Sequence, residues 1–335
     1  MSIGIAFPIG QNETAPEKAP GTLLGPLAAL ARQKKMWSPQ LLAGALWRLA
    51  TNLGRHRRIQ RVLRLPEYAQ LARGEARFPF KYLTRGYLSW NLTVAERAAC
   101  FERHYLRLHE MLPGAFLLSI VKRDATIFVL EDGEDRYEIT LGLPRDHDKE
   151  GELSLNLVAN GQTIYILSFT IVPGRALHRE AEDVFLISRL QGVKGFLKQV
   201  QRATKALHDV APAALLVAAL QGLGEAMDVK EMACVRAQDQ HSYSPEYERP
   251  FRANYDDFFV ELGARKNEAK VYVAPIPLRE KPMLQIKQGH KLRTREKREF
   301  KREVAEKVEA HMRTLSRRGY RLSRPFVLLP ASETV

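Results

Sequence analysis

Residues 151–172 read GELSLNLVANGQTIYILSFTIV, and this stretch decides the fold class. Two runs of alternating or apolar residues flank the dipeptide Asn160-Gly161, and both runs are rich in residues that favour strands. An Asn-Gly pair accepts the positive φ angles of the tight two-residue turns that join antiparallel strands. The stretch therefore predicts an antiparallel hairpin.

The segments around this hairpin extend it into a meander. The runs AFLLSIV (115–121) and TIFVL (126–130) have the composition of strands, and VFLISRL (184–190) predicts a further one. In DRYEITLGL (135–143), Tyr137, Ile139 and Leu141 alternate and fall on one face. Asp132-Gly133 provides a turn signal between TIFVL and DRYEITLGL.

Helical patterns lie on both sides of the meander. Thr93 followed by Glu96 predicts a capping box at the start of a helix, and leucines at three- and four-residue spacing predict another from Pro39. Further helices are expected near 195–207, 212–227 and 253–261, strands at EMACV and AKVYVAP, and a long basic helix over 287–324.

The order of elements predicts an α+β fold with a mostly antiparallel central sheet and flanking helices. A helical extension precedes the sheet and a basic helix follows it. The expected division is a flexible lead-in at 1–35, a basic helical extension at 36–113, an α+β core at 114–280, and the C-terminal helix with its tail at 281–335.

Composition limits the function classes. The chain has 335 residues, a formal net charge of +14 and a pI near 9.8, which favours polyanionic surroundings such as phosphorylated small molecules or anionic lipid. Two isolated cysteines, Cys100 and Cys234, predict neither a metal site nor a disulfide and fit a reducing compartment. The N-terminus lacks the pattern of a signal peptide, and the longest apolar run is too short to span a bilayer. We therefore expect a cytoplasmic protein, either soluble or peripherally bound to the inner membrane.

The stretch SRLQGVKGFLKQVQRATKAL (188–207) passes from a predicted strand into a predicted basic helix. Arg189, Gln191, Gly192 and Gly195 stand at the junction. A helix start offers unpaired amides and positive potential to a phosphate, and glycines permit close approach. The junction therefore predicts a site for a phosphate-bearing ligand. The alternative is a tight turn that needs glycine, with its cations in water.

Basic helices could bind anionic surfaces. One has no acidic residue among its cations and could place arginines on lipid phosphates with Ile and Leu in the interface; its arginines are Arg55, Arg57, Arg58, Arg61 and Arg64. The C-terminal helix interleaves glutamates with its cations, which predicts a solvated helix with internal ion pairs. Nucleic-acid binding is not expected, because no aromatic and basic recognition motif accompanies the charge.

Two further side chains could take part in chemistry. Tyr255 lies on the apolar face of a predicted helix, where it could either pack in the core or donate a proton. His241 falls in a loop between a predicted strand and a predicted helix, where a base could line a site.

Two resemblances give these residues a context. The segments GELSLNLVANGQTIYILSFTIV, VFLISRLQG, QRATKALHDVAPAALLVAAL and NYDDFFVELG resemble the VirK/YbjX family of Gram-negative bacteria over roughly residues 40–320. That resemblance implies a virulence- or stress-associated protein linked to envelope integrity and to resistance against cationic antimicrobial peptides, with no settled biochemical activity.

The second resemblance concerns the fold. The order of strands and helices is similar to the GNAT acyltransferase superfamily, in which a Q/R-x-x-G-x-G/A turn holds the pyrophosphate of acyl-CoA. Arg189 to Gly192 match its first half, and Gly195 comes one residue late. The resemblance implies an acyl-CoA donor, an amine acceptor, Tyr255 as the acid that protonates the leaving thiolate, and a base such as His241. The rival hypothesis is a non-enzymatic protein that binds anionic lipid or another polyanion and supports the envelope.

Overall fold

The computed structural model describes residues 25–32, 39–74, 78–144 and 149–315. The chain forms two compact units, residues 1–53 and 54–335. The described part of the first unit consists of helices α1 (Gly25–Arg32) and α2 (Pro39–Ala50). Most of the predicted lead-in at 1–35 lies outside the described residues, and α1 occupies its end.

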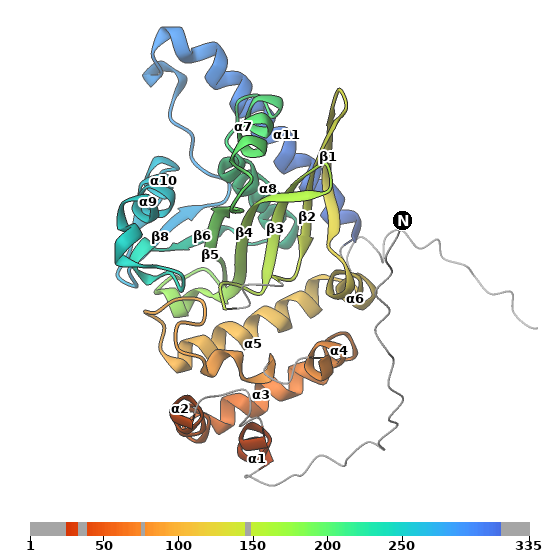
Figure 1. Cartoon of the computed structure of the whole chain (residues 1–335), viewed down its shortest axis with the longest axis vertical. Helices are drawn as coiled ribbons and strands as arrows, with labels where there is room; N and C mark the ends of the chain where they lie inside the picture. Colours follow the sequence, from red (N-terminus) through yellow and green to blue (C-terminus); the bar gives the residue numbers. More distant parts are fainter. Residues whose placement is uncertain (1–24, 33–38, 75–77, 145–148, 316–335) are drawn as a thin grey trace, which may run out of the picture. The chain divides into compact units, whose positions relative to one another are not determined.

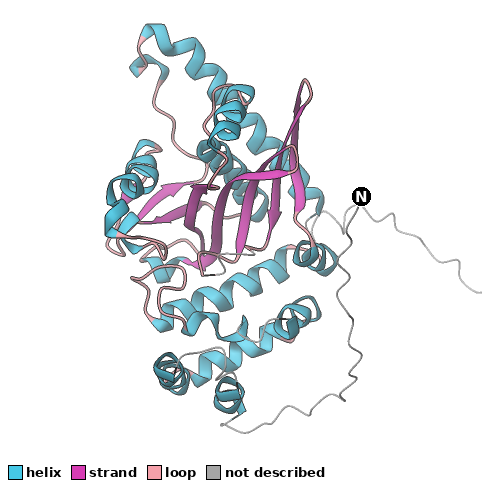
Figure 2. Cartoon of the chain, viewed as in Figure 1, coloured by secondary structure: helices cyan, strands magenta, loops and turns pink. Residues whose placement is uncertain are grey.

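The second unit is built on an eight-stranded, mostly antiparallel sheet with flanking helices, which confirms the predicted fold class (Figures 1 and 2). The strand order is β1-β2-β3-β4-β5-β6-β8-β7. The strands are β1 (Ala125–Asp132), β2 (Asp135–Gly142), β3 (Leu153–Ala159), β4 (Gln162–Pro173), β5 (Asp183–Gly192), β6 (Glu231–Val235), β7 (Arg265–Lys266) and β8 (Val271–Pro275).

The predicted hairpin is the centre of this sheet. Asn160 and Gly161 form a two-residue connection with φ angles of 49° and 79°, which brings Ala159 opposite Gln162. The alternation then places the leucines of β3 on one face and its polar residues, such as Ser154 and Asn156, on the other. The sheet therefore has an apolar face and a face with a polar strip.

Helices supply the layers around the sheet. They are α3 (Leu53–Leu63, which starts at the unit boundary), α4 (Pro66–Gly74), α5 (Val94–Met111), α6 (Gly114–Lys122), α7 (Leu197–Ala206), α8 (Pro212–Met227), α9 (Glu248–Arg252), a π-helix (Ala253–Asp257), α10 (Phe258–Glu261) and α11 (Lys291–Leu315). The nearly all-apolar α8 packs on β3, β4 and β5, and α11 packs along α8 through Phe300, Val304, Val308 and Met312. The rest of α11 carries solvated ion pairs, as predicted.

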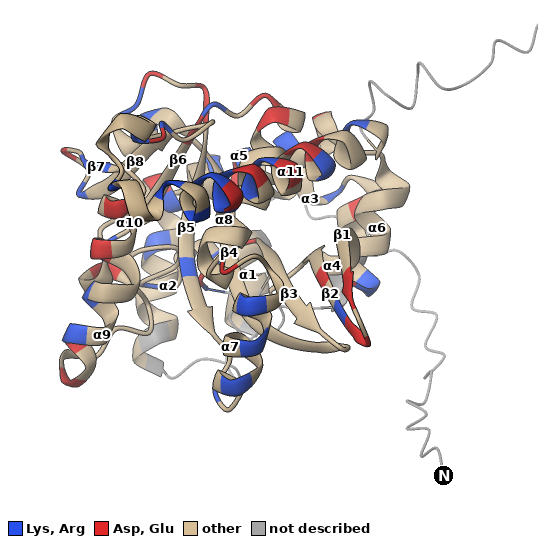
Figure 3. Ribbon diagram, turned by 90° about the horizontal axis from the view of Figure 1, so that it is seen from above, with Lys and Arg blue, Asp and Glu red and all other residues tan. Residues whose placement is uncertain are grey.

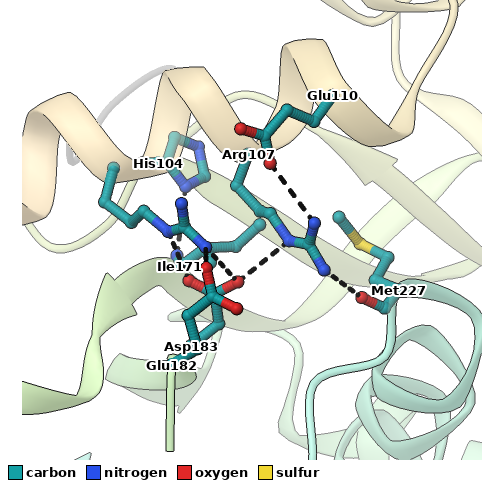
Figure 4. Close-up of polar contacts among 8 residues, drawn as sticks. His104, Arg107, Glu110, Ile171, Glu182, Asp183 and Met227 are labelled. Carbon is teal, nitrogen blue, oxygen red and sulfur yellow. Dashed lines mark hydrogen bonds and ion pairs between the residues drawn. The ribbon is translucent and has the colours of Figure 1, made fainter.

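Helix α5 is fastened to the sheet by polar contacts rather than by packing alone (Figure 4). Thr93 and Glu96 form the predicted capping box at its start. Asp183 on β5 accepts from Arg103 Nε at 2.6 Å and lies 2.9 Å from Arg107 Nε, while the Ile171 amide donates to His104 Nδ1 at 3.0 Å. These contacts fix α5 across β4 and β5.

The strand predicted at 115–121 is wrong, because these residues belong to α6. Pro113 precedes the helix in an extended conformation, and Leu117 and Ile120, three residues apart, are its buried side chains. Two smaller differences concern β7, a two-residue strand that the sequence did not predict, and the C-terminal helix, which begins at Lys291. The predicted residues 316–324 of that helix lie outside the described part of the chain. Within the described residues, no helix has the length and apolarity needed to cross a membrane.

Candidate functional site

The predicted phosphate site lies at the end of β5, where this strand extends beyond its pairing with β6. β5 and β6 form the parallel pair of the sheet, over Phe185–Ile187 and Met232–Cys234. β5 then continues to Gly192 beside β4, and the chain crosses over through α7 and α8 to reach β6. The last residues of β5 are thus paired on the β4 side, beyond the end of the pairing with β6.

A cavity of about 660 Å³ opens at this end of β5. Three of the four residues predicted at the junction line it, namely Arg189, Gln191 and Gly192. Among the described residues that line the cavity, the fourth, Gly195, is not found, whereas the neighbouring Lys194 is. The other lining residues come from several strands and loops: Asp124, Leu143, Pro144, Ser154, Asn156, Thr163, Ile166 and Val193. The end of β5 and the turn after it, up to Lys194, are therefore open to a ligand on the cavity side.

The polar lining follows from strand register. Ser154, Ser168 and Arg189 stand opposite one another across β3, β4 and β5, and Asn156 and Gln191 belong to the next row. Residues directly opposite in antiparallel strands point to the same face. The strip of polar residues on that face ends in the cavity.

Arg189 is held in place before any ligand arrives. The residue is 7% exposed, and its Nε lies 3.6 Å from a carboxylate oxygen of the buried Glu150. With the Gln191 amide turned to satisfy both groups, its oxygen accepts from Arg189 Nε at 2.9 Å and Nη2 at 2.8 Å. A buried guanidinium oriented in this way is suited to an anionic ligand, because little side-chain entropy remains to be lost on binding.

A carboxylate faces the same cavity. Asp124 Oδ2 accepts from Asn156 Nδ2 at 2.8 Å. Gly142 makes room for it, since a Cβ at that position would lie 2.1 Å from Asp124 Oδ1. The cavity thus contains cationic residues from β5 and its following turn, together with an acidic residue just before β1.

The main-chain donors of the junction are partly engaged already. The Leu190 amide donates to Tyr255 Oη at 3.2 Å, and the Val193 amide donates to the Ile164 carbonyl at 3.0 Å. Gly195 has a φ of +92°, so the turn itself requires a glycine there. Anion binding at this site would therefore rest more on Arg189 and Lys194 than on a cradle of amides.

Tyr255 and His241 lie in different surroundings. Tyr255 is buried on the π-helix, and burial raises the pKa of its phenol above the ordinary value. His241 stacks on Trp90, with ring centroids 5.9 Å apart. Among the described residues that line the cavity, neither Tyr255 nor His241 is found. Their predicted catalytic roles stay predictions.

The arginine-rich helix is α3, and its apolar side is not available to a membrane. Ile59, Val62 and Leu63 are buried within the second unit. The charged side remains at the surface, with Arg57, Arg61 and Arg64 exposed and Arg58 bound to Glu102 at 3.0 Å. Arg55 and Arg58 border a second cavity of about 610 Å³ between α3, α5 and the end of β4. The predicted insertion of Ile and Leu beside these arginines is therefore wrong.

Sequence reasoning missed the acidic part of the first cavity. Asp124, Ser154 and Asn156 belong to three separate segments, and only the pairing of β1, β2 and β3 brings them together. The available signal was the set of polar residues in β3, which interrupt an otherwise apolar strand. No group of three or more His, Cys, Asp or Glu residues able to hold a metal occurs in the described part of the chain.

Comparison with known proteins gives the family. Residues 45–310 match the model of a family described as "Protein of unknown function (DUF535)". The chain is 23% identical over 260 residues to "Uncharacterized protein YbjX" of Escherichia coli (strain K12), which covers 75% of this chain and 76% of that protein. No solved structure matches the chain significantly. The family match spans most of the second unit, including the whole cavity, and the chain therefore belongs to the VirK/YbjX (DUF535) family.

Proposed function

We propose that this protein is an acyltransferase that moves an acyl group from an acyl-CoA-type donor to an amine. The single observation that carries the proposal is the cavity at the end of β5, which combines Arg189 and Lys194 with the carboxylate of Asp124. An acyl-CoA-type donor is anionic through its phosphates, and an amine acceptor is cationic until it loses a proton. The cavity offers a matching group for each of them.

The residues of the cavity fit the donor at its phosphate end. Arg189 is pre-oriented by Glu150 and Gln191, and Lys194 follows in the turn toward α7. Both would bind phosphate oxygens through charge-assisted hydrogen bonds. The donor supplies the activated thioester when it is bound.

Asp124 is proposed as the base on the acceptor side. A neutral amine attacks the thioester carbonyl, the new C–N bond forms, the C–S bond breaks, and the amine proton goes to the carboxylate. The leaving thiolate needs a proton to become a thiol. The fold resemblance implies Tyr255 as that donor, and burial keeps its phenol protonated. Its Oη accepts the Leu190 amide proton at 3.2 Å and is not part of the cavity lining, so proton transfer from Tyr255 would require the thiolate to reach the Leu190 side of β5.

The test separates donor binding from transfer. We expect CoA to raise the melting temperature, 3′-dephospho-CoA to raise it less, and pantetheine, which lacks the phosphates, to leave it unchanged. Gln191→Glu places a carboxylate against Arg189 at nearly constant shape, so it should weaken CoA binding by about tenfold or more. Gln162→Glu is the matched control, because the same exchange is made at an exposed residue at the start of β4.

Transfer is measured by mass spectrometry of candidate amines incubated with acyl-CoA. Asp124→Asn should abolish transfer and leave CoA binding intact. Equal stabilisation by CoA and pantetheine, or equal loss in both glutamine variants, would contradict the donor site. Undiminished transfer by Asp124→Asn would contradict the assignment of the base.

In the non-enzymatic alternative, α3 inserts its apolar side chains beside anionic lipid. Those side chains are buried in the core and are not available for insertion. A role in envelope integrity, as the family resemblance implies, is compatible with the proposed activity if the acceptor is an amine-bearing envelope component. Detection of acylated envelope amines in cells that overproduce the protein would support this link.

A further inference from the structure

Two cationic segments with exposed leucines lie at one end of the sheet unit: α7 with the turn before it, and the stretch that leads into α11. Residues 193–207 and 281–295 together hold nine Lys or Arg and no Asp or Glu. Arg293 pairs with Asp209, just after α7, at 3.0 Å, and the rings of His208 and Phe300 lie 4.6 Å apart. Figure 1 shows α7 and the first turns of α11 at the same end of the sheet unit. We call these two segments the α7/α11 surface.

Most of this charge is not neutralised. Arg202 pairs with Asp135 at 2.7 Å and Arg293 with Asp209. Within the described residues, the other seven cations form no ion pair, and they are Lys194, Lys198, Lys205, Lys281, Lys287, Lys291 and Arg295. Figure 3 shows the basic residues on α7, where no acidic residue lies among them. The surface therefore carries a local positive potential.

The same surface exposes large apolar side chains. Leu197 is 69% exposed, Leu284 91% and Leu292 68%, and among the leucines whose side chains the structure describes these three are the most exposed. Single exposed leucines are common, but three leucines within two cationic segments form a pattern. The arginine-rich helix α3 differs in this respect, because the Ile59 side chain that lies among its arginines is fully buried rather than exposed.

We infer that the α7/α11 surface binds the surface of an anionic phospholipid membrane. The cations would lie against lipid phosphates, and the three leucines would enter the boundary between headgroups and acyl chains. A nucleic-acid backbone would match the charge equally well but would leave the leucines without an apolar environment. This inference is independent of the proposed acyl transfer, although Lys194 belongs to the cavity lining as well.

The experiment is flotation of the full chain with vesicles of phosphatidylcholine, with and without phosphatidylglycerol. We expect binding to the anionic vesicles alone, falling steeply as salt is raised. Lys198→Glu with Lys287→Glu changes one cation in each segment and should weaken binding by about tenfold or more. Leu197→Ser with Leu284→Ser and Leu292→Ser leaves the charge unchanged and should also weaken it by about tenfold.

The matched control is Arg57→Glu with Arg61→Glu, which makes the same change in net charge on the exposed side of α3. This variant should bind almost as well as the unmodified protein. Far-UV circular dichroism verifies that every variant is folded.

Three outcomes would overturn the inference. The first is no binding to anionic vesicles. The second is equal loss in the α3 control and the α7/α11 charge variant, which would mean that net charge alone attracts the protein. The third is that the serine variant binds anionic vesicles as well as the unmodified protein does, and that both proteins also bind a single-stranded oligonucleotide tightly. The leucines would then make no contribution, and the surface would bind polyanions through charge alone.

Discussion

Two buried histidines should make the second unit unstable in mild acid. His104 is fully buried on α5 and accepts the Ile171 amide proton at Nδ1, so its neutral form is the one that completes β4 (Figure 4). Burial, with a smaller effect from Lys81, lowers its pKa from 6.5 to about 3. His56, fully buried and stacked on Phe80, has its pKa lowered by burial to about 4.

The sign and size follow from proton linkage. Because each pKa is lowered on folding, the unfolded chain binds protons first as the pH falls below 6.5, and the folded state loses stability in that range. Each histidine contributes a slope of about 1.4 kcal/mol per pH unit below its unfolded pKa. At about pH 5 the loss is about 2 kcal/mol for each residue and about 4 kcal/mol for the pair.

The assay is urea unfolding at a series of pH values from about 8 to about 5. His104→Asn keeps an acceptor near the position of Nδ1 but removes the titrating ring. The variant should be less stable than the unmodified protein at about pH 8, by about 1 to 3 kcal/mol, because ring packing is lost. Its stability should then fall less steeply with acid, by about 1.4 kcal/mol per pH unit.

The slope, rather than the stability at any one pH, decides the question. An unchanged slope in His104→Asn would refute the reasoning, because it would mean that His104 titrates alike in the folded and unfolded chains. A slope that decreases in both His104→Asn and a His56→Phe variant, and nearly vanishes in the double variant, would support it.

Three other substitutions give direct tests. Gly142→Ala puts a Cβ 2.1 Å from Asp124 Oδ1, and the displaced carboxylate should lower the rate of acyl transfer by about a hundredfold while CoA binding, measured calorimetrically, is retained. Gly222→Ala puts a Cβ 2.2 Å from a carbonyl oxygen of α11 and should lower the stability by about 1 to 3 kcal/mol, seen as a lower melting temperature. Lys81→Met leaves the buried Glu152 without its cation at 2.9 Å and should cost about 3 to 5 kcal/mol in urea unfolding, part of which Glu152→Gln should restore in the double variant.

The sheet was largely predictable, because its signals are local. The Asn160-Gly161 turn and the alternation in the strands beside it fix both the hairpin and its inward face. The error at 115–121 arose because the local signal there is ambiguous. Six apolar residues and one serine fit a buried strand or a buried helix equally well, and the choice depended on Pro113 and on the partners that cover Leu117 and Ile120.

The site was predictable only where its residues are neighbours in sequence. Arg189, Gln191 and Gly192 were found because they share one strand end. Asp124 was not found, because it meets Asn156 through the register of three strands, and a shift of one residue would turn Asn156 to the other face. Long-range register of this kind is not encoded in any single window of the sequence.

The short parallel contact between β5 and β6 has a consequence for the order of assembly. Strands β1 to β5 pair in chain order, so each can join its predecessor at low entropic cost. β6 must wait until the crossover through α7 and α8 has closed, and it then gains only three paired positions on β5. We expect the five-stranded meander to form early, and the β6–β8 edge to dock late and to exchange its amide hydrogens with solvent first.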